Sequence, residues 1–309
     1  MFKNFSPQSL TINGRQSELI ELALTYGFKG MDVDMHEMYR RNQRSENKDA
    51  SKYLDAAKKS FNIKLGTFDS GLDLDADEDS YSASVGALGP IAEMAAAQGV
   101  SRASVKVPAS TDRLPYHEYF AAITDRLGKA AEVFAPHDIK LAVAFQSGKE
   151  LAEGKEFEFV RNVEGFISLV RGVGNAGVGF YIDTWDWVVG DGAMDQLSEL
   201  KAEEIVAVRI GSIPEDVDVS KAESWQKLVP TAEGPVNHVK LIAHLNSIGY
   251  DGPLSPAANG RSYKGQTRES IVQAGQEAVD AICTEAGMEV TPLPKDSIDE
   301  SAYETAPAI

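Results

Sequence analysis

Short apolar runs alternate with longer stretches of helical spacing along nearly the whole chain. The short apolar runs predict buried parallel strands. Between them apolar residues recur on one helical face, which predicts amphipathic helices. The predicted strands lie within residues 2–10, 30–34, 64–69, 103–107, 140–145, 178–182, 205–210 and 252–255. The predicted helices are 17–24, 49–61, 80–98, 116–135, 158–171, 194–201, 236–247 and 267–286.

Eight successive strand-helix units predict a (β/α)8 barrel, the TIM barrel, in the α/β class. An open doubly wound sheet would normally have a glycine-rich phosphate turn after its first strand, and the sequence contains neither GxGxxG nor GxxxxGK[ST]. We therefore predict a single barrel domain over residues 1–286. Residues 287–309 are predicted to form a polar tail that is flexible or draped on the surface, in preference to an oligomerisation arm.

Composition narrows the class of protein. The chain has 309 residues, 43% of them hydrophobic, and a formal net charge of −17, which argues against extended contact with nucleic acid or an anionic membrane. A lone cysteine, Cys283, excludes an intrachain disulfide and is interpreted as a buried helix residue. The N-terminus has no secretory or transit pattern, and no run of 18 apolar residues occurs, so a cytoplasmic location is expected.

The polar residues that end the predicted strands are the candidates for chemistry, because ligands in this fold bind at the carboxyl ends of the strands. The clearest case is residues 178–186, where an apolar run ends in Asp183 and Asp186. Such a strand would deliver two carboxylates to the rim of the barrel. The full set of strand-end residues is Asp32, Asp34, His36, Asp69, Lys106, Ala144, Gln146, Asp183, Asp186, Arg209, Ala257 and Asn259.

Four segments resemble a known family. They are residues 27–34 (Gly-Phe-Lys-Gly-Met-Asp-Val-Asp), 126–143, the Asp183-Thr184-Trp185 box, and 248–256 (Ile-Gly-Tyr-Asp-Gly-Pro-Leu-Ser-Pro). Over residues 1 to 286 the chain resembles the xylose isomerase-like barrels, in particular the sugar phosphate isomerase/epimerase group with its inosose dehydratase and ketose 3-epimerase relatives. The resemblance implies a sugar isomerase or epimerase. It also implies one divalent cation, held by a glutamate ending strand five, an aspartate ending strand six, a histidine in strand seven and a glutamate after strand eight.

Most of these implied ligands are replaced here. The four positions fall on Ala144, Asp183, Arg209 and Ala257, and Asp186 stands where relatives often have a substrate-contacting histidine. A guanidinium cannot ligate a cation and stays protonated. We therefore predict no metal cofactor, and instead an ion pair from Arg209 to Asp183 or Asp186, with Lys106 nearby, in a polar pocket.

Candidate roles follow, each beside a plainer alternative. Asp183 or Asp186 could take a proton next to a sugar carbonyl while Lys106 or Arg209 polarises the oxygen, although all four could equally be ion-pair partners. Candidate substrate-binding residues are Trp185, Gln146, Glu150, His36 and Asn259. For Trp185 the alternative is packing over the barrel rim, and for His36 and Glu150 it is an ordinary loop position.

Three function classes remain for comparison. The first is a degenerate, metal-independent or non-catalytic member, a pseudoenzyme that binds a sugar, polyol or sugar phosphate. The second is an active isomerase or epimerase that uses lysine and arginine electrostatics, or an unrecognised metal set such as Asp32, Asp69, Asp183 and Asp186. The third is a nuclease, because the barrel family includes an abasic-site endonuclease branch. Five scattered histidines and strong acidity argue against its multi-zinc cluster. Assembly into a homo-oligomer is left open.

Overall fold

The computed structural model describes residues 1–44 and 51–290. Its main feature is one nine-stranded sheet in which all neighbouring strands are parallel. The strand order is β3-β2-β1-β11-β10-β9-β7-β5-β4. The strands are β1 Phe2–Phe5, β2 Gly30–Met31, β3 Lys64–Leu65, β4 Phe68–Asp69, β5 Arg102–Lys106, β7 Lys140–Ala144, β9 Val178–Asp183, β10 Ile205–Ile210 and β11 Pro253–Pro256.

The two ends of this sheet are halves of one bent strand. Only Gly66 and Thr67 separate β3, which pairs with β2, from β4, which pairs with β5. Counting β3 and β4 as one, the nine strands become eight and the sheet closes on itself. The first and last strands also pair, with Phe2 opposite Pro253. The predicted (β/α)8 barrel is therefore confirmed, with its third strand interrupted in the middle.

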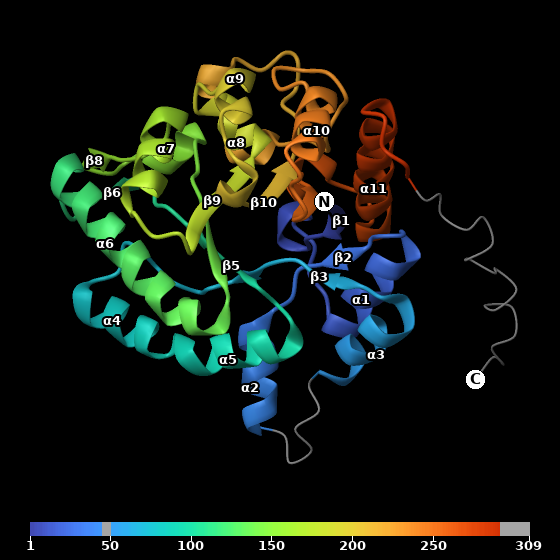
Figure 1. The fold of residues 1–309 in the computed structure, drawn as a ribbon. Helices are drawn as coiled ribbons and strands as arrows, with labels where there is room; N and C mark the ends of the chain where they lie inside the picture. Colours follow the sequence, from blue (N-terminus) through green and yellow to red (C-terminus); the bar gives the residue numbers. More distant parts are fainter. Residues whose placement is uncertain (45–50, 291–309) are drawn as a thin grey trace, which may run out of the picture.

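Helices surround the barrel, as Figure 1 shows. Those that match predicted helices are α1 Gln16–Thr25, α3 Lys52–Phe61, α5 Leu88–Gln98, α6 Tyr116–Phe134, α7 Val163–Gly172, α9 Met194–Ser198, α10 His238–Ser247 and α11 Arg268–Glu285. The predicted start of the second helix at Asp49, and the tail from residue 291 onward, lie outside the described residues. No helix of residues 1–44 or 51–290 is long and apolar enough to cross a membrane.

Several elements were not predicted. They are α2 Met35–Arg44, α8 Thr184–Val189 and the antiparallel pair of β6 Ser110–Thr111 with β8 Phe157–Glu158, and the predicted helix 80–98 is split into α4 Glu78–Gly86 and α5. The sequence of α2 is mostly polar, but Met35, Met38 and Tyr39 recur on one helical face, and Met35 and Met38 are buried. The Asp34 carboxylate accepts the Glu37 N–H at 2.8 Å, the hydrogen bond of a helix N-cap. This cap and the short apolar stripe together favour α2.

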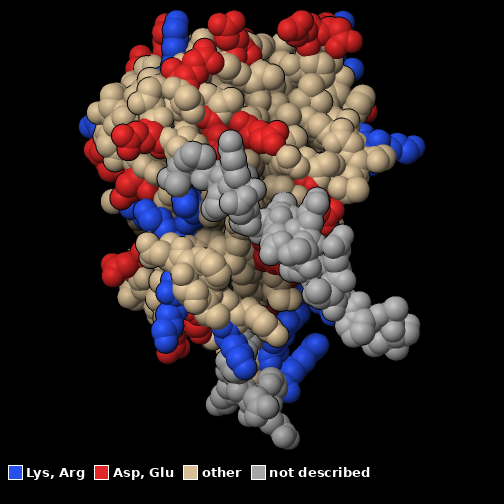
Figure 2. Space-filling view, turned by 90° about the vertical axis from the view of Figure 1, so that its right-hand side faces the viewer, with Lys and Arg blue, Asp and Glu red and all other residues tan. Residues whose placement is uncertain are grey.

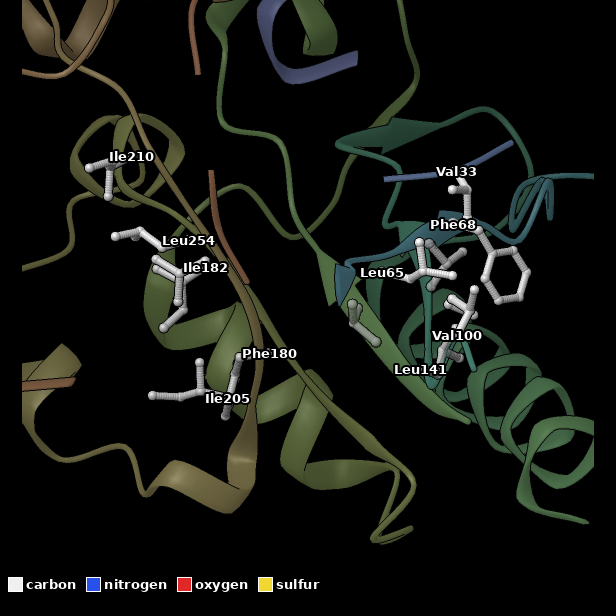
Figure 3. Packing of buried hydrophobic residues seen from close by; sticks show 14 of the residues in the cluster. Val33, Leu65, Phe68, Val100, Leu141, Phe180, Ile182, Ile205, Ile210 and Leu254 are labelled. Atoms are coloured by element: carbon white, nitrogen blue, oxygen red, sulfur yellow. The ribbon is translucent and has the colours of Figure 1, made fainter. Parts of the chain in front are cut away.

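The hydrophobic core forms two layers. The larger layer lies between the strands and the helices, and Figure 3 shows two parts of it, around Ile182 and around Phe68. The smaller layer consists of Ala142, Ala144, Tyr181, Val206 and Ala207. Successive strand residues point to opposite faces, so every second residue points into the barrel. Where that residue is an alanine, its small side chain leaves room for a larger one from a neighbouring strand. Tyr181 and Arg209 use this room, because the Arg209 guanidinium carbon lies 4.8 Å from the centre of the Tyr181 ring.

Candidate functional site

Asp183 is the last residue of β9 and also the N-cap of α8. Its Oδ1 accepts the backbone N–H of Trp185 at 2.9 Å and that of Asp186 at 3.3 Å. The register of the parallel strands places Arg209 of β10 beside it, and Arg209 Nε donates to Asp183 Oδ2. The predicted ion pair between Arg209 and Asp183 is therefore confirmed.

Lys227 completes the charge pattern around the two aspartates. Its Nζ lies 2.5 Å from Asp183 Oδ2 and 3.2 Å from Asp186 Oδ2, so one ammonium group bridges both carboxylates. An antiparallel bridge between Ser212 and Leu228, with two backbone hydrogen bonds of 2.9 Å, folds the Lys227 loop back against the end of β10. Lys227 was not among the residues selected from the sequence, because it lies in a polar loop without periodicity.

Asp186 is held from its other side by Ser147. The Ser147 N–H and hydroxyl both donate to Asp186 Oδ1, at 3.0 and 3.1 Å. We call Asp183, Asp186, Arg209 and Lys227 the mouth network. Its two carboxylates and two cations are largely buried, and their formal charges sum to zero. Buried charges are tolerated when they are paired and hydrogen-bonded in this way.

The mouth network separates the pKa values of its two acids. Burial alone would raise the pKa of the Asp183 carboxyl, but Lys227 and Arg209 outweigh burial and hold this pKa well below its usual range. Burial and the neighbouring Asp183 charge raise the pKa of Asp186, and Lys227 and Arg209 only partly oppose them. Asp183 is therefore a weaker base than Asp186, since both its oxygens are occupied and its pKa is lowered.

A cavity of about 700 Å³ opens beside the mouth network. It is lined by residues from the ends of many strands and by α2, which supply charge of both signs. Arg209 is the one member of the mouth network that reaches this lining. Polar side chains of the lining include Asp32, Asp69, Lys106, Tyr181 and Arg209. The cavity therefore brings together strand-end residues from β2 round to β10, and of the five side chains just named the sequence selected all but Tyr181.

Asp32 is a carboxylate of the cavity wall without a cationic partner among the described residues. Its Oδ1 accepts the Thr67 N–H at 2.7 Å and the Asn4 side-chain amide at 2.9 Å. Burial raises the pKa of Asp32, and hydrogen bonds from Ser6, Thr67 and Asn4 only partly oppose this effect. Asp32 is therefore closer than Asp183 to the proton affinity that a general acid or base requires.

Gly66 makes the Asp32 contacts sterically possible. A Cβ at this position would collide with the side-chain oxygens of Asp32 and Asn4. We expect Gly66→Ala to lower the free energy of unfolding by about 1–3 kcal/mol, the usual cost of overpacking a filled interior. Gly86→Ala, at the end of α4, is the matched control, because a Cβ there meets nothing within 4 Å, and it should not lower the free energy of unfolding. Urea unfolding of both variants measures the difference, and equal stabilities would contradict this account of Gly66.

Lys106 is the last residue of β5 and lies beside Ala144 in the sheet register. Its side chain lines the cavity, and no described residue forms an ion pair or hydrogen bond with its ammonium group. Partial burial lowers the pKa of Lys106, the charges of Arg209 and Lys227 lower it further, and Asp69 and Asp186 oppose them. Lys106 is therefore a cation repelled by its cationic neighbours and lacking a contact partner of its own.

The barrel fold agrees with a match to a known protein family. The model of the "Xylose isomerase-like TIM barrel" family matches residues 20–283. The chain belongs to this family. No curated protein sequence matches the chain.

Solved structures of the family share the fold at low identity. A xylose isomerase domain protein from Alicyclobacillus acidocaldarius subsp. acidocaldarius superimposes with a TM-score of 0.80 at 19% identity, over 93% of this chain and 99% of that one. The IOLI protein with a binding zinc atom gives a TM-score of 0.73 at 16% identity, over 93% and 99%. D-psicose 3-epimerase, in the presence of D-fructose, gives 0.66 at 13% identity, over 93% and 100%. At these identities the likeness concerns the fold alone.

The four family positions do not fit a divalent cation in this chain. Ala144 and Ala257 have no side-chain ligand atoms, and Arg209 is a cation. The remaining position, Asp183, already binds two cations and two backbone N–H groups. Within residues 1–44 and 51–290 no group of three or more His, Cys, Asp or Glu side chains could hold a metal ion, which covers the set of Asp32, Asp69, Asp183 and Asp186.

Two residues selected as substrate contacts hold the loop that carries Lys227. Glu150 Oε1 accepts the Ser224 N–H at 3.0 Å, and the Asn259 side-chain amide donates to the Ser224 carbonyl at 3.3 Å. Ser224 begins a single 3-10 turn, Ser224–Gln226, that ends at Lys227. Neither Glu150 nor Asn259 lines the cavity. Both side chains therefore hold the loop that carries Lys227, through hydrogen bonds to Ser224.

The other sequence candidates divide between the cavity and the core. His36 lines the cavity, and its Nε2 lies 2.9 Å from the Ser70 carbonyl oxygen, to which it donates. Asp34 also lines the cavity but caps α2. Trp185 is 1% exposed, and Lys227 Nζ lies 5.2 Å from the centre of its ring. Gln146 is half-buried after β7 and, like Trp185, is absent from the cavity lining.

Proposed function

We propose that this barrel binds a small sugar or polyol in the strand-end cavity without a divalent cation. The observation that carries the proposal is the Lys227 ammonium group, which bridges Asp183 and Asp186 at 2.5 and 3.2 Å. With Arg209 beside it, Lys227 supplies in fixed form the positive charge that an ion would bring. A divalent ion entering this network would face two permanent cations at short range, which Coulomb repulsion disfavours.

The cavity wall supports a polyhydroxylated ligand. Asp32 and Asp69 offer carboxylate oxygens, Lys106 and Arg209 offer N–H donors, and Tyr181 also lines the cavity. Hydroxyl groups both donate and accept hydrogen bonds, so they match a wall that carries both kinds of group. A volume of about 700 Å³ holds a small molecule with water. The family neighbours whose names specify a sugar, such as D-psicose 3-epimerase, agree with this ligand class.

The test is ligand binding with and without a chelator. Purified protein should contain far less than one divalent ion per chain by elemental analysis. Stabilisation by a set of ketoses and polyols, measured as a rise in melting temperature, should be unchanged by EDTA, since a ligand that binds only the folded state stabilises it by RT ln(1 + [L]/Kd). One tightly held divalent ion per chain, or stabilisation that EDTA abolishes, would overturn the proposal.

A second candidate, metal-independent epimerisation or isomerisation, is favoured by one observation. Asp32, whose pKa burial raises, and the cation Lys106 line the same cavity, so a base and an electrostatic stabiliser are both available. Asp183, in contrast, is fully occupied by its partners. Exchange of the proton next to the carbonyl of a bound ketose, followed by NMR in D2O with EDTA present, separates the two candidates. Exchange supports catalysis, and binding without exchange supports a binding protein.

A further inference from the structure

The mouth network is electrically self-contained, whereas Lys106 is not. Asp183 and Asp186 balance Arg209 and Lys227 through direct contacts. Lys106 has no such contact with any described residue. The acid on the adjacent strand β4 is Asp69. It pairs in the sheet with Ser104, two residues before Lys106. Asp69 Oδ1 instead accepts the Gly71 N–H at 2.9 Å. One positive charge at the cavity floor is therefore left without a contact partner.

Arg209 adds unused donors to the same part of the cavity. Of its guanidinium nitrogens, only Nε donates to a described residue, namely Asp183. Nη1 and Nη2 have no acceptor among the described residues, and they are not enclosed, since Arg209 lines the cavity. Planar guanidinium N–H groups and a lysine ammonium are the donors that proteins use for carboxylate and phosphate groups.

Three further arginines add positive charge to the cavity lining, although the whole chain is acidic, with a net charge of −17. In Figure 2 lysine and arginine side chains gather toward the lower end of the face shown, where α2 lies in Figure 1, while acidic side chains dominate its upper part. Arg40 and Arg41 of α2 line the cavity and share the single carboxylate of Glu37, each at 2.8 Å. Arg15 also lines the cavity and has no ion pair within the described part of the chain.

We propose that the ligand carries a negatively charged group, and that Lys106 Nζ and the free Nη atoms of Arg209 bind this group at the cavity floor. The rest of the ligand bears hydroxyl groups, which donate hydrogen bonds to the carboxylates of Asp32 and Asp69. Asp32 and Asp69 line the same cavity, and their carboxylates repel a carboxylate of charge −1 less than a phosphate dianion. The inference rests on the proposed function, since it assigns a substrate class to the same cavity: sugar acids.

The test compares sugars that differ only in charge. Isothermal titration calorimetry of the full chain would use three pairs, glucose with glucuronate, galactose with galacturonate and sorbitol with gluconate, and glucose 6-phosphate as a separate arm. In at least one pair the acid should bind about 10-fold or more tightly than its neutral partner, the size of a charge-assisted hydrogen bond. Glucuronate should also bind more tightly than glucose 6-phosphate. Tighter binding of the phosphate would overturn the assignment to a carboxylate.

Substitutions of Lys106 test whether its ammonium group binds the negatively charged group of the ligand. Lys106→Gln should weaken acid binding by about 10- to 100-fold and leave neutral-sugar binding nearly unchanged, whereas Lys106→Arg should retain most of the affinity. Lys29→Gln is the control, because it removes the same charge just before β2, at the opposite end of the barrel, and Lys29 is exposed there. Equal losses for the acid and the neutral sugar would show that Lys106 shapes the cavity, and would overturn the inference.

The two proposals fail in different ways. Neutral sugars that bind as tightly as their acids would overturn the assignment of an anion and leave the proposed function standing. Absence of binding by every sugar, acid and phosphate in the set would overturn both. Circular dichroism and urea unfolding of Lys106→Gln guard against a misfolded variant, and Lys106→Arg provides the second reading if Lys106→Gln does not fold.

Discussion

Lys227→Met should lower the free energy of unfolding by about 3–5 kcal/mol, the cost of leaving a buried charge without its partner. The substitution keeps most of the side-chain volume and removes only the ammonium group that bridges Asp183 and Asp186. Two buried carboxylates would then share Arg209 alone. Urea unfolding at neutral pH measures the loss. The loss should shrink as the pH falls, because protonation of Asp186 removes one of the two uncompensated charges.

A double variant tests the cause of this loss. Asp186→Asn in the Lys227→Met background removes the second carboxylate and should recover about 1–3 kcal/mol relative to Lys227→Met alone, the range of coupling energies between side chains in contact. Lys221→Met is the control, since Lys221 forms an exposed ion pair with Asp218 at 2.9 Å and its removal should leave stability unchanged within error. No coupling between positions 186 and 227 would argue that Lys227 acts through packing alone.

Asp183→Asn should lower the free energy of unfolding by about 3 kcal/mol at neutral pH, because Arg209 and Lys227 lose their shared counter-charge. Asparagine is itself a good N-cap, so α8 keeps its first hydrogen bonds and the loss reports the charge. Glu132→Gln, on the exposed face of α6, is the control for removal of a carboxylate and should leave stability unchanged within error.

The pH dependence of that loss has a definite sign. The pKa of Asp183 lies below that of an unfolded aspartate, about 3.9, so the stabilisation is present above about pH 4 and is lost as the pH falls through the folded-state pKa. The difference between the wild type and Asp183→Asn should therefore narrow below about pH 4. Asp186 has a raised pKa, so folding favours its protonated, neutral form; this contribution to stability is fully present below the pKa of an unfolded aspartate and is lost as the pH rises through the folded-state pKa. A difference for Asp183→Asn that is constant from pH 7 to about pH 3 would contradict the ion-pair account.

The barrel was predictable because each strand is a compact apolar run with both faces covered. β9 and β10 match their predicted bounds to within a residue. Glycines lie just after the ends of α1 and α5, at Gly27 and Gly99, as is common where helices end. The interruption of the third strand was not predictable from the local pattern; Gly66, at the interruption, lies against Asp32 and Asn4, which are far from it in sequence.

The site was predictable only where strand register carries the information. Asp183 and Arg209 end adjacent strands, so their pairing follows from the fold. Lys227 is positioned by a backbone bridge within a long loop and by Glu150 and Asn259, which arrive from other loops. Sequence patterns contain no signal for such an encounter. The same limit applies to the cavity, because sequence selects Lys106 but cannot reveal that it lacks a partner.

Asp183 caps α8 through two backbone N–H groups in addition to its ion pairs. This capping helps to begin α8 and does not depend on a metal. An aspartate at the end of strand six is therefore by itself poor evidence of a working metal centre. The residues that face it from strand seven and from the following loop are the better diagnostic, because a cation at either place changes the chemistry of the whole barrel end.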